Sequence, residues 1–139
     1  MPTEENKALV RRYYDEVVSQ HKLEVLDGII GTAADGARES FKEGHRRTQT
    51  YLQSGFPDLH ESVEQLIAED DRVTVVTTFE GTHTGGEYSG IPATGKHLKI
   101  PVAGIWRVSG GKLVDLWFTA NLFSVYEQLG VVSRADLQR

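Results

Sequence analysis

The sequence predicts an α+β fold, a cone-shaped barrel in which a strongly curved antiparallel sheet wraps over three N-terminal helices and leaves an internal pocket. Helix-like segments come first and strand-like segments follow, without the alternation typical of parallel sheets. A Gly-rich connection at 81–96 joins two strand-like segments and is too long for a tight hairpin. A later strand-like segment carries Trp117, and Asn121 follows four residues on.

Length and composition narrow the classes of protein. The 139 residues fit one domain, 1–139, which needs no disulfide or metal for stability. The absence of cysteine excludes a disulfide framework, a thiolate metal site and a cysteine nucleophile. With a net charge of −5 and no long basic block, nucleic-acid binding is not expected. No apolar run reaches the ~20 residues of a membrane span, and the acidic N-terminus is no signal peptide. We therefore expect a cytoplasmic protein without membrane contact.

The first half of the chain predicts three helices. Near the N-terminus, apolar residues recur every four positions in two adjacent rows, which form one broad stripe on a helix. The rows are Leu9, Tyr13 and Val17, and Val10, Tyr14 and Val18. A second helix is predicted over 23–30 and a third over 43–54, with a small, polar loop at 32–40 between them. The third helix ends before Pro57, which is unable to continue it.

The second half predicts antiparallel strands over 59–69, 72–80, 98–108 and 113–119, and then a helix over 122–129. Alternation is clearest in the second strand, where one face holds Val73, Val75, Thr77 and Phe79. On the first strand, one side holds Leu59, Val63, Gln65 and Ile67. Trp106 and Trp117 are both placed inward. A sheet curved over helices encloses space that large side chains or a ligand must fill.

Seven segments carry a family resemblance. They are Asn6-Lys7-Ala8-Leu9-Val10-Arg11-Arg12-Tyr13-Tyr14, Phe56-Pro57-Asp58-Leu59, Ala68-Glu69-Asp70-Asp71-Arg72-Val73, Gly81-Thr82-His83-Thr84-Gly85, Gly90-Ile91-Pro92-Ala93-Thr94-Gly95-Lys96, Gly111-Lys112-Leu113-Val114-Asp115-Leu116-Trp117 and Gln128-Leu129-Gly130. With them the chain resembles the SnoaL-like polyketide cyclases, a branch of the nuclear transport factor 2-like superfamily, over 6–132. That superfamily hosts enzymes and non-enzymatic binders, so the resemblance is a weak guide to the reaction.

The resemblance implies a cofactor-free enzyme that closes a ring by intramolecular aldol condensation of a polyketide ester. In that family a carboxylate, usually Asp four residues after the tryptophan, is the general acid/base. Here the position is Asn121, whose amide is able to donate a hydrogen bond to an enolate oxygen but does not take a proton. Relatives also carry a His-containing, Pro-rich segment after the second helix. The segment 31–40 is shorter, so we expect one wall of the pocket to differ.

Other residues are candidates for the general base that Asn121 does not supply, or for contacts with the substrate. His83 titrates near neutrality and is a candidate base, or else a loop histidine bonded to backbone. Asp115 shares a strand face with Trp117 and would replace the base if that face is concave, or else lies in solvent. As residues that contact the substrate we expect Tyr13, Tyr14, His45, Tyr51, Trp106 and Trp117, with packing or solvent exposure as the alternative.

Two classes of function remain open. One is a cofactor-independent cyclase or isomerase acting on a polyketide-like or other apolar carbonyl substrate, aromatic or polycyclic, with a hydroxylase-like diverged member as a variant. The other is a non-catalytic small-molecule-binding or dimerisation domain. No His pair shows the spacing of a metal site, so no metal is expected. Because Val76, Ile105 and Leu116 are placed on the outer face of the sheet, we expect a homodimer.

Overall fold

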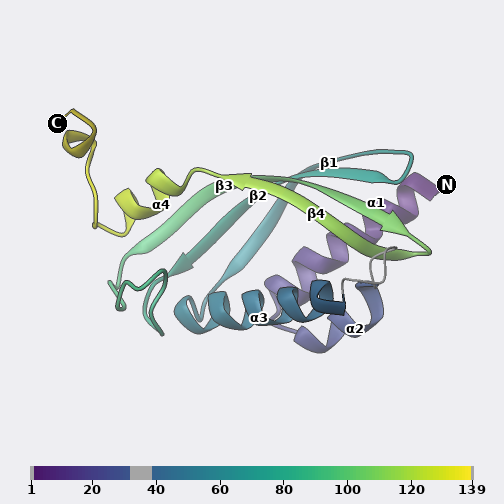
Figure 1. Cartoon of the computed structure of the whole chain (residues 1–139), viewed down its shortest axis with the longest axis horizontal. Helices are drawn as coiled ribbons and strands as arrows, with labels where there is room; N and C mark the ends of the chain where they lie inside the picture. Colours follow the sequence, from purple (N-terminus) through teal and green to yellow (C-terminus); the bar gives the residue numbers. More distant parts are fainter. Residues whose placement is uncertain (1, 32–38, 139) are drawn as a thin grey trace.

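A computed structural model describes residues 2–31 and 39–138 and confirms the predicted α+β fold. One antiparallel sheet has the strand order β1-β2-β3-β4. Its strands are β1 (His60–Glu69), β2 (Arg72–Thr82), β3 (His97–Ser109) and β4 (Lys112–Ala120). The sheet is curved and does not close, and it forms a layer over the N-terminal helices (Figure 1).

Helical segments precede and follow the sheet. The first are α1 (Pro2–Arg12), a π-helical turn (Tyr13–Val18), a 3₁₀ turn (Leu23–Val25), α2 (Leu26–Ile29) and α3 (Glu39–Gly55). The last are α4 (Leu122–Gln128) and a 3₁₀ turn (Arg134–Gln138). The loop predicted at 32–40 falls largely on 32–38, outside the described residues, and α3 begins at Glu39 rather than at 43. In the described ranges no helix is long and apolar enough to cross a membrane.

The π-helical turn brings two consecutive tyrosines to the interior. In this turn Tyr13, Tyr14, Val17 and Val18 are all buried. The predicted double row of apolar residues is therefore confirmed here, and both phenol rings lie in the core.

A β-bulge in β1 corrects the predicted face of that strand. The register with β2 shifts between Val63 and Gln65, so residues beyond the bulge change faces. Gln65 and Ile67, predicted on the side of Leu59, are exposed. Ahead of the bulge, Leu59 and Glu61 are both buried, which puts a carboxylate on the concave face of the sheet.

A second shift of register, beside Arg107, sets the faces of β4. Trp106 pairs with Leu116, and Ile105 pairs with Trp117. Trp106 is fully buried, whereas Trp117 is 61% exposed on the outer face. The inward placement of Trp117 is therefore wrong, and so is the outward placement of Leu116, which lines the interior.

The long connection between β2 and β3 is held against the end of α3. The Gly85 N–H donates to the Gly55 carbonyl at 3.1 Å, and the Gly86 N–H donates to the Ser54 carbonyl at 2.9 Å. A Cβ added at Gly85 would lie 1.9 Å from the carbonyl oxygen of Ser54, so only glycine fits there. The connection thus forms a fixed wall at the end of α3.

The apolar core lies between the concave face of the sheet and the helices. Its largest fully buried side chains include Trp106, Phe56, Leu26, Ile29 and Leu113. Helix α4 closes one end of the sheet and is followed, as predicted, by Gly130, whose φ of 82° favours glycine.

Candidate active site

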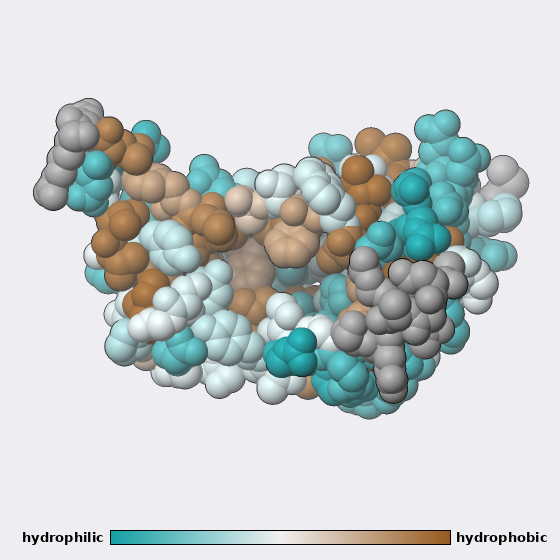
Figure 2. Space-filling view, in the orientation of Figure 1, coloured by the Kyte–Doolittle hydropathy of each residue, from teal (hydrophilic) through white to brown (hydrophobic). Residues whose placement is uncertain are grey.

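A cavity of about 710 Å³ lies between the concave face of the sheet and α3. Its apolar wall comes from the sheet and includes Phe79, Leu98, Ile100, Val102 and Leu116. Its polar groups come from the helices and β1 and include Tyr13, Tyr14, His45, Gln49 and Glu61. Hydrophobic side chains are recessed between the sheet and the helices in Figure 2. A cavity of this size and character suits a small, mostly apolar molecule.

Glu61 is a buried carboxylate on the cavity wall. The Ser19 hydroxyl holds its backbone, accepting from the Glu61 N–H at 2.9 Å and donating to the Glu61 carbonyl at 3.2 Å. The Thr77 hydroxyl donates to Oε2 at 2.5 Å, and Oε1 takes no part in that bond. Burial raises the pKa of Glu61 from 4.5 to about 7, against the opposing effect of the Thr77 bond. A carboxylate that titrates near neutrality is suited to take and return a proton.

Tyr14 offers an O–H donor to the same cavity. The indole N–H of Trp106 donates to the Tyr14 hydroxyl at 3.0 Å. Because an indole only donates, the Tyr14 oxygen is the acceptor, and no acceptor among the described residues takes its own proton. Burial, together with the charge of Glu61, raises the pKa of Tyr14 well above its usual range, so the phenol stays protonated.

Three side chains on the helix wall form a hydrogen-bonded chain. Gln49 donates through Nε2 to the Tyr13 hydroxyl at 3.2 Å, and this hydroxyl lies 2.9 Å from Nδ1 of His45. Burial lowers the pKa of His45 from 6.5 to about 4, so its ring is neutral at pH 7. With Gln49 donating to it, Tyr13 gives its own proton to Nδ1, which leaves the ring proton on Nε2. His45 thereby adds a neutral N–H donor.

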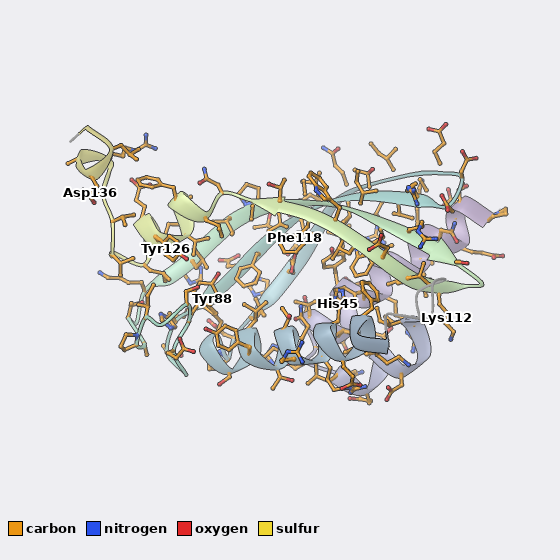
Figure 3. All side chains as sticks on the ribbon, in the orientation of Figure 1. His45, Tyr88, Lys112, Phe118, Tyr126 and Asp136 are labelled. Atoms are coloured by element: carbon orange, nitrogen blue, oxygen red, sulfur yellow. The ribbon has the colours of Figure 1, made fainter. Side chains whose placement is uncertain are left out.

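Aromatic and apolar side chains surround the mouth of the cavity. Phe118 and Leu122 line it and are 62% and 56% exposed. Opposite them, the Tyr51 hydroxyl accepts from the Ser89 N–H at 2.7 Å, and the rings of Tyr51 and Tyr88 stack with centroids 6.2 Å apart. In Figure 3, Phe118 and Tyr88 face the space between β4 and α3. The exposed side chains therefore give the mouth of the cavity an apolar surface.

Most residues predicted to contact the substrate lie on this cavity. Those that line it are Tyr13, Tyr14, His45 and Tyr51. Trp106 lies behind them, with its ring centroid 4.8 Å from that of Tyr13, and packs in the core. Trp117 faces away on the outer side of the sheet. The core-packing interpretation therefore describes the position of Trp106, and substrate contact by the four residues that line the cavity stays a prediction.

Two of the three residues predicted as catalytic lie at the surface. Asn121 is exposed and caps α4, where its Oδ1 accepts from the Ser124 N–H at 3.0 Å. Asp115 is exposed, and its Oδ1 accepts from the Leu116 N–H at 2.9 Å. Neither is among the described residues that line the cavity. Catalytic roles for both stay predictions, and the contacts seen are those of a helix cap and of a surface carboxylate.

The third residue predicted as catalytic, His83, is fully buried inside the connection between β2 and β3. Its Nδ1 accepts from the Thr94 N–H at 3.3 Å, so Nε2 carries the ring proton and donates to the Gly86 carbonyl at 3.1 Å. Its ring stacks on Phe56 with centroids 5.2 Å apart. These contacts hold the connection together and match the alternative of a loop histidine bonded to backbone.

Sequence reasoning missed two groups on the cavity wall. Glu61 had a signal, because it stands between Leu59 and Val63 at every second position of a strand face that is otherwise apolar. For Gln49 the sequence holds no signal beyond its place one helical turn after His45. Among the described residues, no group of three His, Cys, Asp or Glu side chains is arranged to hold a metal ion.

Sequence and structure both relate the chain to known proteins. Residues 8–129 match the family model of the SnoaL-like polyketide cyclases. A comparison with curated proteins gives no significant match. A candidate SnoaL-like polyketide cyclase from Jannaschia sp. CCS1 superposes with a TM-score of 0.80 at 20% identity, over 96% of this chain and 97% of that one. A candidate polyketide cyclase from Acidithiobacillus ferrooxidans gives 0.77 at 25% identity, over 90% and 94%. AclR, a candidate hydroxylase from Streptomyces galilaeus, gives 0.76 at 24% identity, over 94% and 99%.

Proposed function

This chain belongs to the SnoaL-like polyketide cyclase family, and on that premise we propose that it catalyses cofactor-independent proton transfer on an apolar carbonyl compound. The substrate class is polyketide-like or another ring-bearing ketone or ester, held in the cavity of about 710 Å³. The observation that carries this proposal is Glu61, a buried carboxylate with a pKa of about 7 on the wall of an apolar cavity. A base in that setting is matched to removing a proton from carbon next to a carbonyl.

In the proposed reaction, Oε1 of Glu61 takes the proton from the carbon α to the substrate carbonyl. The C–H bond breaks, its electron pair forms the enolate, and the carboxylate becomes a neutral acid. Thr77 remains bonded to Oε2 throughout, which keeps the other oxygen free for the proton. The enolate carbon then attacks a second carbonyl of the same molecule, or is reprotonated at another position. Glu61 returns the proton to the new alkoxide or to carbon, so the enzyme ends unchanged.

Tyr14 is the proposed donor to the enolate oxygen. Its O–H proton is not used by Trp106, and it lines the same cavity as Glu61. Burial, and after it the charge of Glu61, raises the pKa of Tyr14, so the phenol keeps its proton beside the carboxylate. A fixed donor at a developing oxyanion contributes about 10²-fold or more to the rate.

This assignment moves the acid/base role from the end of β4 to β1. Asn121 stands where the family resemblance expects a carboxylate, and its amide oxygen caps α4. Glu61 supplies a carboxylate from the opposite edge of the sheet, since β1 and β4 are the two outer strands. We propose that Glu61 replaces the missing Asp in function.

The outer face of the sheet supports the proposal of a homodimer. Ile67 pairs with Thr74, Thr74 with Ile105, and Ile105 with Trp117, so one row crosses all four strands. Ile67, Ile105 and Trp117 are 63%, 38% and 61% exposed. An apolar row of this length on an open sheet face suits association with a second copy.

The direct test is deuterium exchange at C2 of 1-tetralone, a bicyclic ketone, followed by proton NMR in D₂O. Wild type should accelerate loss of the C2–H signal over buffer, and Glu61→Gln should reduce the acceleration by about 10²-fold or more. Glu80→Gln is the matched control, because Glu80 lies on β2 outside the described cavity lining and bonds to His97 at 2.7 Å. Exchange that is unchanged in Glu61→Gln would remove Glu61 from the mechanism and favour a binding role for the cavity.

A further inference from the structure

A second polar subsite lies at the mouth of the cavity, where we infer that Arg47 and Tyr51 bind a carboxylate group of the ligand. The inference rests on the proposed function and refines it, because it makes the substrate an acidic carbonyl compound, such as an oxo acid with an apolar ring. Both residues line the cavity from α3, and both are exposed to solvent.

Arg47 is a cation without a counter-ion in the protein. Among the described residues that line the cavity it is the one permanent positive charge, and Glu61 is the one carboxylate. Its guanidinium has no ion pair or hydrogen bond within the described residues. Two carboxylates of the helices are engaged by its neighbour instead, since Arg46 lies 2.7 Å from Asp27 and 3.5 Å from Glu43. The N–H donors of Arg47 are therefore available to a ligand.

Tyr51 adds a fixed donor one helical turn after Arg47. Residues four positions apart are neighbours on the surface of a helix. The Tyr51 hydroxyl oxygen accepts from the Ser89 N–H at 2.7 Å, and its ring stacks on that of Tyr88 with centroids 6.2 Å apart. No acceptor among the described residues takes the Tyr51 proton, so its O–H is a free donor held in place beside the guanidinium.

The pair stands on the boundary between the cavity and a smaller hollow on the surface of α3. The residues that line this hollow are Glu43, Arg46, Arg47, Thr50, Tyr51 and Ser54. Of that set, Arg47 and Tyr51 also line the cavity. A ligand whose ring lies in the cavity is thus able to place a charged group at these two residues without removing the charge fully from water.

The two donors suit a carboxylate. A planar guanidinium donates two parallel hydrogen bonds to the two oxygens of a carboxylate, and the Tyr51 O–H serves a remaining lone pair. A single cation offsets one negative charge, whereas a phosphate dianion would bring an unpaired charge to a cavity that already holds Glu61. Binding of the carboxylate at the mouth leaves the apolar ring to pack on the sheet wall.

The test compares two bicyclic ketones, 6-carboxy-1-tetralone and its primary amide, which match in size and planarity and differ in charge. By calorimetric titration at about pH 8, where the acid is ionised, wild type should bind the carboxylate roughly tenfold more tightly than the amide. Raising the salt concentration from about 0.02 M to about 0.5 M should reduce this preference, because ions screen an exposed ion pair. This comparison uses the wild-type protein, so it does not depend on how any variant folds.

Variants locate the preference at the mouth. Arg47→Gln should bring the affinities for the carboxylate and the amide to within about twofold of each other. Arg46→Gln is the matched control, because it removes the same charge one residue away and outside the described cavity lining, and it should keep the full preference. Tyr51→Phe should reduce the preference by about threefold.

Three results would overturn the inference. They are equal affinities for the two compounds in wild type, no measurable binding of the carboxylate, and a preference that survives in Arg47→Gln. A preference unchanged in Tyr51→Phe would remove Tyr51 from the subsite.

This outcome is separable from that of the proposed function. Binding of the two ketones to Glu61→Gln should keep the preference for the carboxylate even where deuterium exchange of 1-tetralone is lost. If Glu61→Gln still exchanges and the preference is present, the proposed catalytic role falls while the subsite stands. If exchange depends on Glu61 and the preference is absent, the subsite falls while the catalytic role stands.

Discussion

Thr77 donates its hydroxyl to Oε2 of Glu61 across the β1–β2 pair, with an Oγ1–Oε2 distance of 2.5 Å. The bond fixes one carboxylate oxygen, Oε2, and does not engage the other, Oε1. Burial of the same carboxylate raises its pKa to about 7. One cross-strand contact thus orients a group whose surroundings also prepare it to exchange a proton near neutral pH.

Replacing Glu61 should change stability in a way that depends on pH. The pKa of Glu61 rises from 4.5 to about 7 on folding, so the folded state holds the extra proton between these values. The associated stability is fully present below the unfolded pKa and is lost as pH rises through the folded pKa. At about 1.4 kcal/mol per pKa unit, the loss approaches about 3 kcal/mol. We expect Glu61→Gln to match wild type near pH 4 and to exceed it by about 2–3 kcal/mol near pH 8, measured by urea unfolding.

His45 also titrates in this range, but it is present in both proteins, so its effect cancels in the difference. A stability difference that stays constant from about pH 4 to about pH 8 would show that Glu61 has no raised pKa.

The rate of exchange should follow the ionisation of Glu61. The carboxylate form is the base, and burial raises its pKa to about 7. The C2 exchange rate of 1-tetralone should therefore rise about tenfold per pH unit below about 6 and level off above about 8. Tyr14 does not oppose this rise, because its own pKa lies well above the usual range. A profile that is already flat from about pH 5 would point to a base with an ordinary carboxyl pKa.

Tyr14→Phe should lower the exchange rate by about 10²-fold, because it removes the donor to the enolate oxygen. It should also lower stability by about 1–3 kcal/mol, since the buried indole N–H of Trp106 loses its acceptor. Tyr126→Phe is the matched control, as Tyr126 lies on α4 outside the described cavity lining. A Tyr14→Phe protein that is folded and exchanges at the wild-type rate would exclude the proposed donor role.

Gly85→Ala should destabilise the protein by about 2–4 kcal/mol, because the new Cβ would meet the Ser54 carbonyl oxygen at 1.9 Å. The new Cβ meets a backbone oxygen rather than a flexible side chain, so the clash is relieved only if the backbone moves. Gly28→Ala is the comparison, as a Cβ there meets nothing within 4 Å. That change should be neutral or stabilising by up to about 1 kcal/mol. Equal melting temperatures for the two variants would show that the connection is not held against α3 as described.

Trp117→Lys should convert the proposed dimer into a monomer. It places a charge in the exposed row formed with Ile105 and Ile67 on the outer face, where association would bury it unpaired. Sedimentation equilibrium at micromolar concentration should give twice the chain mass of 15.5 kDa for wild type and one chain mass for the variant. A wild-type mass of one chain would refute the dimer.

The regular parts of the fold could be predicted from the sequence because their periodicity is strong. The rows through Tyr13 and Tyr14 and the alternation from Val73 to Phe79 each reflect one repeating geometry. The two β-bulges have no such signature. The bulge in β1 turns Ile67 outward, and the one between β3 and β4 places Trp106 opposite Leu116 rather than Trp117. Alternation alone therefore assigns residues beyond each bulge to the wrong face of the sheet.

The candidate site was only partly predictable for the same reason. The cavity-lining residues that the sequence predicts on the first and third helices stand out because they are aromatic or titratable. Glu61 is not among the predicted residues, although Leu59 and Val63 mark its face as buried. The place of Asn121 was inferred from its spacing after Trp117, but the chain has turned into α4 by that point, and the amide caps the helix. Spacing along the chain does not reveal such a turn.

The measurement that tests the central claim most directly is the titration of Glu61 itself. Carbon-13 NMR of the side-chain carboxyl groups, with Glu61→Gln used to assign the resonance, reports the protonation of this residue at each pH. We predict a midpoint near pH 7, and a change in that midpoint when 1-tetralone is added, because the ketone removes water from the carboxylate. A midpoint near the ordinary value of about 4.3 that does not respond to the ketone would contradict Glu61 as the base of this cavity.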